Sequence, residues 1–241
     1  MTTYVLIPGA GGSAWYWHRL VPELQQRGHD VVAVDLPASD DSAGLTEYAD
    51  TVVDAVVNSV GHRTELIVVA QSMGGFTGPL VCQRLPVHLL ILLNAMVPLP
   101  GERIFDWWFR SGHGEARARQ AARDGRTLDG EGDLFEDLFH DVPADVRDEA
   151  LALGEPAQST RPFAQRWPLN AWPDVPTRFL QGSDDRFLPV EFQRRIVRER
   201  LGFVPDEMPG GHLVALSRPK ELADRLERYR AEIQEPSSSR T

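Results

Sequence analysis

The stretch at residues 65–76, ELIVVAQSMGGF, constrains the fold more than any other part of the chain. Residues 66–70 form a continuous apolar run rich in β-branched side chains, which is typical of a strand buried on both faces of a parallel sheet. The run ends at Gln-Ser-Met-Gly-Gly, and the spacing of the following residues predicts a helix over 76–84. The stretch therefore predicts a strand, a sharp turn at Ser72 and a helix.

A serine at so sharp a strand-to-helix turn carries its hydroxyl above the sheet, beside the free N–H groups of the new helix. Such a nucleophile elbow needs small residues two positions before and two after the serine. Ala70 and Gly74 meet this need, although Ala70 is one methyl group larger than the usual glycine. The motif without its context is weak, because a structural turn uses the same residues. The flanking strand and helix favour the nucleophile.

Length and charge limit the class of protein. The 241 residues predict one α/β domain, or one domain with an insertion. A net charge of −10 argues against a nucleic-acid surface and against an anionic membrane face. Neither a signal peptide nor an apolar run of membrane-spanning length is visible, and Cys82 is the sole cysteine. We expect a cytoplasmic monomer or homodimer without nucleic-acid or membrane partners.

Strand and helix patterns alternate over most of the chain. Buried strands are predicted at 4–7, 30–35, 66–70, 89–94 and 177–181, with a short one at 203–207. Helices are predicted at 15–27, 46–60, 76–84, 190–200 and 217–233. This alternation indicates a mostly parallel sheet with helices on both faces.

The alternation stops after the fourth strand. Residues 98–175 show no strand pattern, and their helical stretches are acidic and rich in arginine. We expect this segment to be a helical cap on a core formed by residues 1–97 and 176–235, with a disordered tail at 236–241. Of Trp107, Trp108 and Phe109 in the cap, we expect one or two to face a substrate.

A nucleophilic serine needs a base that takes its proton and an acid that orients the base. In a parallel sheet these partners lie on loops at the carboxyl ends of later strands. Two loops qualify: residues 182–189, GSDDRFLP, and residues 210–212, GGH. His212 is therefore the candidate base, and Asp184 and Asp185 are both candidate acids. The sequence Gly-Ser-Asp-Asp is also common in turns, so either aspartate could be a turn residue instead. We interpret the remaining histidines as loop residues: His18, His29, His62, His88, His113 and His140.

With these motifs the chain resembles the α/β-hydrolase superfamily. Its opening, PGAGGSAWYW…LVPELQQRGHDVVAVDLPAS, resembles the plant methylesterase and hydroxynitrile-lyase branch and its bacterial esterase relatives. The resemblance implies an α/β-hydrolase fold with a helical lid. The family's acid motif, Gly-x-x-Asp-x-x-x-Pro, selects Asp185 over Asp184. The alternative acid position after the fourth strand holds Asn94, which offers no carboxylate.

The resemblance also implies an oxyanion hole. Its two donors would be the backbone N–H of Met73, after the nucleophile, and that of Ala10, in the loop after the first strand. Pro8 stands where the family motif has histidine, which leaves the Ala10 N–H available. Two such donors are worth roughly 3 kcal/mol each in related sites.

These residues predict a serine carboxylesterase that cleaves small alkyl or aromatic esters of the methyl-ester type. Hydroxynitrile lyases of the related branch carry lysine after the catalytic histidine and threonine in the first loop, where this chain has Leu213 and Ala10. Hydrolysis is therefore favoured over the lyase alternative. A ligand-binding protein with a relict triad is a further alternative. We expect neither a cofactor nor a metal, because the histidines lack metal-ligand spacing.

A dinucleotide-binding oxidoreductase is the rival from another class. Residues 9–14, GAGGSA, match a dinucleotide fingerprint, and Asp35 stands where a ribose-binding acid belongs. Short-chain dehydrogenases that resemble this layout use a Tyr-x-x-x-Lys pair. Here Lys220 is the only lysine, and Leu216 precedes it by four residues. Aromatic residues at 15–17 would also crowd a bound pyrophosphate. This reading is therefore disfavoured, and Asp35 is interpreted as a structural cap.

Overall fold

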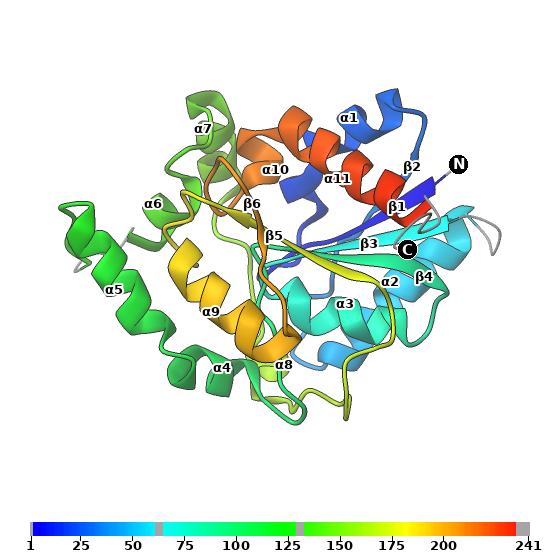
Figure 1. Ribbon diagram of the computed structural model, residues 1–241, viewed down its shortest axis with the longest axis horizontal. Helices are drawn as coiled ribbons and strands as arrows, with labels where there is room; N and C mark the ends of the chain where they lie inside the picture. The colour runs from blue at the N-terminus through cyan, green and yellow to red at the C-terminus, as the bar shows by residue number, and fades with distance from the viewer. Residues whose placement is uncertain (1, 61–64, 129–132, 235–241) are drawn as a thin grey trace, which may run out of the picture.

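A six-stranded parallel sheet runs through the centre of the described part of the molecule (Figure 1). The structure is a computed structural model, and it describes residues 2–60, 65–128 and 133–234. The strand order is β2-β1-β3-β4-β5-β6. The strands are β1 (Thr2–Ile7), β2 (Asp30–Ala33), β3 (Glu65–Gln71), β4 (Val87–Leu93), β5 (Thr177–Gly182) and β6 (Asp206–Met208).

The apolar runs explain this arrangement, because interior strands of a parallel sheet are covered on both faces. β1 is buried along its whole length, and β3 and β4 are buried at all but one residue each. The predicted strands are confirmed, with small shifts at their ends. The sixth strand lies at Asp206–Met208 rather than at 203–207, and β2 ends at Ala33.

Helices cover both faces of the sheet (Figure 1). One apolar cluster joins one face to α1 and α11, and a second joins the other face to α2, α3 and α9. These helices are α1 (Leu20–Gln26), α2 (Leu45–Val60), α3 (Gly74–Cys82), α9 (Val190–Leu201) and α11 (Pro219–Gln234). The α/β class and the two helical layers predicted from the sequence are therefore confirmed.

Two predicted helices differ in detail. The helix predicted at 15–27 is a short 3-10 turn, Ala14–Trp17, followed by α1. The Ser13 hydroxyl accepts a hydrogen bond from the Trp15 N–H and starts the turn, as a capping side chain does. Similarly, a separate turn, α10 (Val214–Ser217), precedes α11, which begins at Pro219 because proline suits the first position of a helix.

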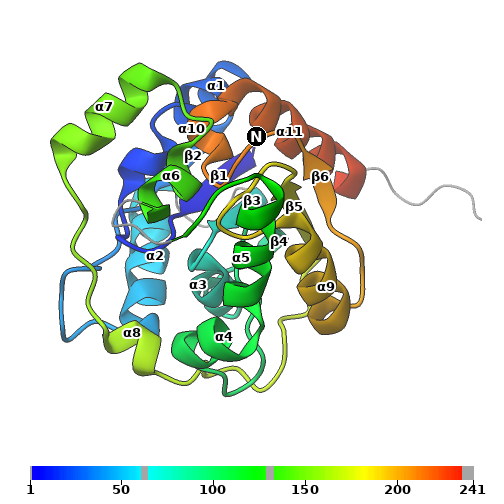
Figure 2. The ribbon, with the colours of Figure 1, turned by 90° about the vertical axis from the view of Figure 1, so that its left-hand side faces the viewer.

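The segment between β4 and β5, residues 98–175, is called the insertion here. Its described part holds the helices α4 (Ile104–Arg110), α5 (His113–Arg123), α6 (Asp133–Phe139), α7 (Ala144–Leu153) and α8 (Arg161–Ala164). One isolated bridge, between Arg103 and Arg166, ties its two ends together. Helices α4 to α7 gather at the end of the molecule opposite the N-terminus, beyond the carboxyl ends of the strands (Figures 1 and 2). The predicted tail at 236–241 lies outside the described residues.

The strand order reverses direction at one point of the sheet. From β1 the chain moves outward to β2 and then returns to the other side of β1 for β3. Loops that leave neighbouring strands in opposite directions open a crevice at the carboxyl ends, where ligands bind in open α/β sheets. In this sheet the switch point lies between the ends of β1 and β3. Within the described residues, no helix is both long and apolar enough to cross a membrane.

Candidate active site

Ser72 occupies a strained position at the carboxyl end of β3. Its φ is +54°, a left-handed conformation that non-glycine residues rarely adopt, and such strain clusters at active sites. Three backbone hydrogen bonds hold the turn in this conformation. The Ser72 N–H donates to the Leu93 carbonyl, and the Ser72 carbonyl accepts from the N–H groups of Gly75 and Met96. The residue is 8% exposed. The turn therefore holds Ser72 at the carboxyl edge of the sheet.

Small residues around Ser72 are required by close contacts. A Cβ on Gly74 would lie 2.8 Å from the Pro8 carbonyl oxygen, and one on Gly78 would lie 2.8 Å from the Cβ of Ala70. Side chains at these positions would push α3 away from the sheet. The spacing of small residues in the sequence thus reflects how closely the turn and the helix approach β1 and β3.

The loop after β1 lies against the Ser72 side chain. A Cβ on Gly9 would come within 2.8 Å of the Ser72 Cβ and 3.3 Å of its Oγ. The loop forms a turn in which the Gly12 N–H donates to the Gly9 carbonyl, so Ala10 stands inside the turn. Met73 directly precedes the first residue of α3, where backbone N–H groups have no partner within the helix. Gly9, which precedes Ala10, and Met73 therefore both adjoin Ser72.

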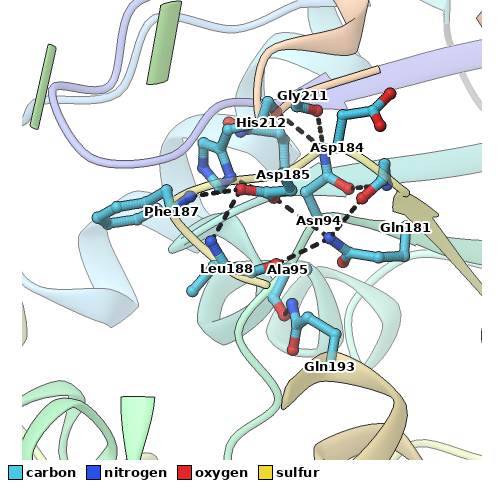
Figure 3. Close-up of polar contacts among 12 residues, drawn as sticks. Asn94, Ala95, Gln181, Asp184, Asp185, Phe187, Leu188, Gln193, Gly211 and His212 are labelled. Atoms are coloured by element: carbon cyan, nitrogen blue, oxygen red, sulfur yellow. Dashed lines mark hydrogen bonds and ion pairs between the residues drawn. The ribbon is translucent and has the colours of Figure 1, made fainter. Parts of the chain in front are cut away.

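His212 and Asp185 form a buried pair (Figure 3). The imidazole Nδ1 lies 2.8 Å from Asp185 Oδ2, and each residue is 2% exposed. The other carboxylate oxygen accepts hydrogen bonds from the N–H groups of Phe187 and Leu188, at 2.9 and 2.8 Å. A carboxylate fixed on both oxygens holds the imidazole with Nδ1–H toward Asp185. In the neutral ring Nε2 is then the free acceptor.

The neighbouring Asp184 has a different contact. Its Oδ2 accepts a hydrogen bond from the Gly210 N–H at 2.9 Å. Of the two adjacent aspartates, Asp185 thus contacts the imidazole and Asp184 contacts the backbone before it. Gln181, fully buried on β5, adds a hydrogen bond of 3.2 Å to Asp185 Oδ2.

Asn94, directly after β4, ties the acid loop to the histidine loop (Figure 3). Its Oδ1 accepts from the Gly182 N–H at 2.6 Å, and its Nδ2 donates to the carbonyls of Gly211 and His212 at 3.0 and 2.8 Å. Gln71, the residue before Ser72, donates to the same His212 carbonyl at 3.4 Å. The ends of β3, β4 and β5 and the loop after β6 therefore converge at one edge of the sheet.

The three aromatic residues at 107–109, of which one or two are expected to face a substrate, lie at different depths. Trp107 is completely buried, whereas Phe109 is 77% exposed. Trp108 is half-buried and packs on Phe187, with ring centroids 5.4 Å apart. Phe187 in turn meets the His212 ring edge-on at 4.9 Å. The Phe187 ring therefore lies between Trp108 and the His212 imidazole.

Several residues near this edge were not among the sequence-predicted candidates. His113, interpreted above as a loop histidine, is 2% exposed, and its Nε2 lies 2.7 Å from the Phe187 carbonyl. Burial lowers the pKa of its imidazole, although the bond to Phe187 opposes this. Asp141 and Gln158 of the insertion also contact the core loops. No sequence motif marks these three residues, because their partners lie 70 to 147 positions away in the chain.

Asp35 makes a structural contact. Its Oδ1 accepts a hydrogen bond from the Ala14 N–H at 2.7 Å, where the 3-10 turn begins. Among the described residues, no group of three or more histidine, cysteine, aspartate or glutamate side chains could hold a metal ion.

A parallel α/β sheet with a strained serine after β3, a buried histidine–aspartate pair and an insertion after β4 defines the α/β-hydrolase class. The comparison with protein families agrees: the model of the alpha/beta hydrolase family matches residues 4–225. The chain belongs to this family.

Curated relatives span almost the whole chain. "Probable esterase PIR7A" of rice, Oryza sativa subsp. indica, is 28% identical over 95% of this chain and 96% of its own length. The alpha-hydroxynitrile lyase of Arabidopsis thaliana is 25% identical over 92% of this chain and 95% of its own length.

A solved structure shows the same fold. An extracellular α/β-hydrolase from a Paenibacillus species, described as homologous in structure and function to tobacco salicylic acid binding protein 2, superposes with a TM-score of 0.75. The identity is 20%, and the match covers 95% of this chain and 98% of that chain.

Proposed function

We propose that the protein is a serine carboxylesterase that works through an acyl-enzyme on Ser72. The observation that carries the proposal is the buried contact of 2.8 Å between His212 and Asp185, placed at the sheet edge where β3 turns at Ser72. A serine hydroxyl is a weak nucleophile, and an oriented neutral imidazole is the base that activates it.

The proposed reaction has two halves. In the first, the Ser72 Oγ attacks the acyl carbon while His212 Nε2 takes the hydroxyl proton, and the same proton then passes to the leaving alcohol. In the second half, His212 takes a proton from water, which attacks the acyl-enzyme and releases the acid and free Ser72. Asp185 orients the imidazole throughout, and the N–H groups of Ala10 and Met73 stabilise the oxyanion of both tetrahedral intermediates.

We further propose that the insertion is the cap of the site and that the substrate is a small ester with an alkyl or aromatic part. Trp108 and Phe187 support this, because their rings form an apolar wall that reaches the His212 imidazole. Relatives named as esterases support ester hydrolysis.

The hydroxynitrile lyase relative supports a second candidate, cleavage of a cyanohydrin. We rank it lower because Leu213, which is 7% exposed and apolar, follows His212 where lysine stands in the lyase branch. Incubation with an aromatic cyanohydrin and measurement of cyanide release would separate the two activities.

The first test is hydrolysis of short-chain aryl esters by wild type and by Ser72→Ala. We expect the substitution to lower turnover by at least about 10⁴-fold. Asp185→Asn should lower it by about 10⁴-fold, because the amide holds the wrong imidazole tautomer. Ser183→Ala, an exposed serine of the acid loop, is the matched control and should keep wild-type activity.

A covalent probe gives the second measurement. A fluorophosphonate should label Ser72 alone, as read by mass spectrometry. Unchanged turnover in Ser72→Ala would refute the proposal. Labelling without turnover on a broad ester panel would favour a hydrolase-fold binding protein.

A further inference from the structure

The loops that carry the proposed oxyanion donor and base are rich in glycine. Gly11 and Gly12, after β1, have φ values of +80° and +64°, and Gly210, before the histidine, has +127°. Glycine has the widest backbone freedom of all residues, so such loops lose the most conformational entropy when they are ordered. Hydrogen bonds from outside the loops therefore help to order the segments that carry the Ala10 N–H and the His212 ring.

Gln158 of the insertion contacts the first of these loops. Its Oε1 accepts a hydrogen bond from the Gly11 N–H at 2.8 Å, one residue after Ala10. Its Nε2 donates to the Tyr48 hydroxyl at 3.1 Å. Tyr48 lies on α2 and is fully buried, so it provides a rigid anchor. The amide of Gln158 thus bridges a core helix to the loop that bears the oxyanion donor.

Asp141 makes the matching contact on the second loop. Its Oδ2 accepts a hydrogen bond from the Gly211 N–H at 2.7 Å, one residue before His212. A hydrogen bond from an N–H to a carboxylate is shorter and about twice as strong as one between neutral groups. The Asp141 side chain also packs closely against the loop, because a Cβ added at Gly211 would lie only 2.5 Å from Asp141 Oδ1. The neighbouring His140 contacts the Asp184 carbonyl at 3.0 Å.

The third loop is held from the insertion as well. The Nε2 of His113, the first residue of α5, lies 2.7 Å from the carbonyl of Phe187, whose N–H binds Asp185. Each of the three loops after β1, β5 and β6 therefore has a hydrogen bond with a side chain of the insertion. None of these bonds joins two side chains, and each contacts backbone beside a proposed catalytic group.

We propose that Gln158 and Asp141 are positioning residues of the active site: Gln158 aims the Ala10 N–H at the oxyanion, and Asp141 sets the His212 imidazole against Ser72. This inference rests on the proposed esterase function. The insertion then does more than cover the substrate, because it completes the geometry of the catalytic loops. A displacement of 1 Å at reacting groups costs on the order of 10²-fold in rate.

Paired variants test the inference. Gln158→Leu and Asp141→Ala remove the acceptor, whereas Gln158→Glu and Asp141→Asn keep an oxygen that accepts the same N–H. We expect the first two to lower kcat by about 10- to 100-fold with little change in KM, since the groups that bind the ester remain in place. The conservative variants should recover most of the loss. Glu155→Gln and Asp145→Asn, exposed acids of the insertion, are matched controls and should behave as wild type.

The rate of Ser72 labelling by a fluorophosphonate is the decisive readout, because it needs the base and the oxyanion donors but no ester-binding pocket. It should fall in parallel with kcat in Gln158→Leu and Asp141→Ala, while the melting temperature stays within a few degrees of wild type. Labelling at the wild-type rate in both variants would overturn the inference and leave the esterase proposal intact. A large fall in melting temperature without rescue by the conservative variants would also overturn it, in favour of a purely structural role. Failure of wild type itself to label would instead refute the proposed function.

Discussion

At the scale of single residues, two backbone outliers mark the candidate site. Among the described non-glycine residues, only Ser72 and Asn94 have a positive φ, +54° and +45°, and each directly follows a neighbouring strand of the sheet. Asparagine tolerates this conformation better than most residues. The strained turn at Ser72 places its hydroxyl at the sheet edge. The strained conformation at Asn94 allows its side-chain amide to bond to two loops. Strain at this edge therefore has two different purposes.

Replacement of Asn94 tests the second purpose. In Asn94→Asp, one carboxylate oxygen can still accept from the Gly182 N–H, but the other would face the carbonyls of Gly211 and His212. A carboxylate that is fully buried among acceptors costs about 3–5 kcal/mol of stability at neutral pH. The residue must be protonated to donate, so its folded-state pKa would be raised.

The sign of the pH dependence follows. A raised folded-state pKa gives stability that is present in acid and is lost as the pH rises through that pKa. Urea unfolding of Asn94→Asp at pH 5 and pH 8 should therefore show a smaller deficit relative to wild type at pH 5. An equal deficit at both values would contradict this role of the Asn94 amide.

At the scale of elements, the close approach of α3 to its surroundings holds the nucleophile turn in place. A Cβ on Gly75 would overlap the carbonyl oxygen of Met96, and one on Gly78 would lie 3.2 Å from a methyl group of Leu90. The helix can pack this closely against the sheet and the Met96 backbone only because its inner surface lacks side chains at both positions. The first turn of α3, with the Met73 N–H, is thereby placed beside the end of β1.

We predict that Gly75→Ala lowers stability by about 1–3 kcal/mol, because the added methyl must push α3 away from the Met96 backbone. Esterase activity should fall with it, since Met73 moves with the helix. Gly114→Ala is the matched control: a Cβ there meets no atom within 4 Å, and alanine in a helix is about 0.5–1 kcal/mol more favourable than glycine. Thermal unfolding of both variants measures the contrast. Equal melting temperatures would refute the close-packing explanation.

At the scale of the whole molecule, one acidic side chain joins distant parts of the chain. Glu227 of α11 accepts a hydrogen bond of 2.6 Å from the Tyr4 hydroxyl of β1 and lies 2.9 Å from the ring of His29, just before β2. Arg230 pairs with it at 3.2 Å. Burial alone would raise the pKa of Glu227, but the hydrogen bonds from Tyr4, Arg230 and His29 outweigh burial and lower it.

A lowered carboxyl pKa makes the fold sensitive to acid. The stabilisation is fully present above the unfolded-state pKa of about 4.3 and is lost as the pH falls through the lower folded-state pKa. Glu227→Gln should therefore melt below wild type at pH 7, and the difference should shrink as the pH falls toward 3. Thermal unfolding across this range checks the expectation. A difference that persists unchanged at pH 3 would show that the carboxylate charge is not the cause.

Much of the fold was predictable because its signals are local. The apolar run of β3 and the small residues around Ser72 lie within a dozen positions of each other, so burial and turn geometry are readable in order along the chain. The prediction of one continuous helix at 15–27 was wrong, because the Ser13 cap and the Asp35 carboxylate stabilise a separate 3-10 turn before α1. Asp35 contributes through a contact across 21 positions, which no local pattern records.

The linear order of residues was enough for the strand–turn–helix at Ser72, the alternation that makes a parallel sheet, and the short list of candidate partners, since each depends on residues close in the chain. Tertiary structure alone decided that Asn94 links two loops, and that Gln158 and Asp141 reach the glycine-rich segments. These are hydrogen bonds between groups brought together by folding. Their partners have no fixed spacing in sequence, so only the packed chain defines them.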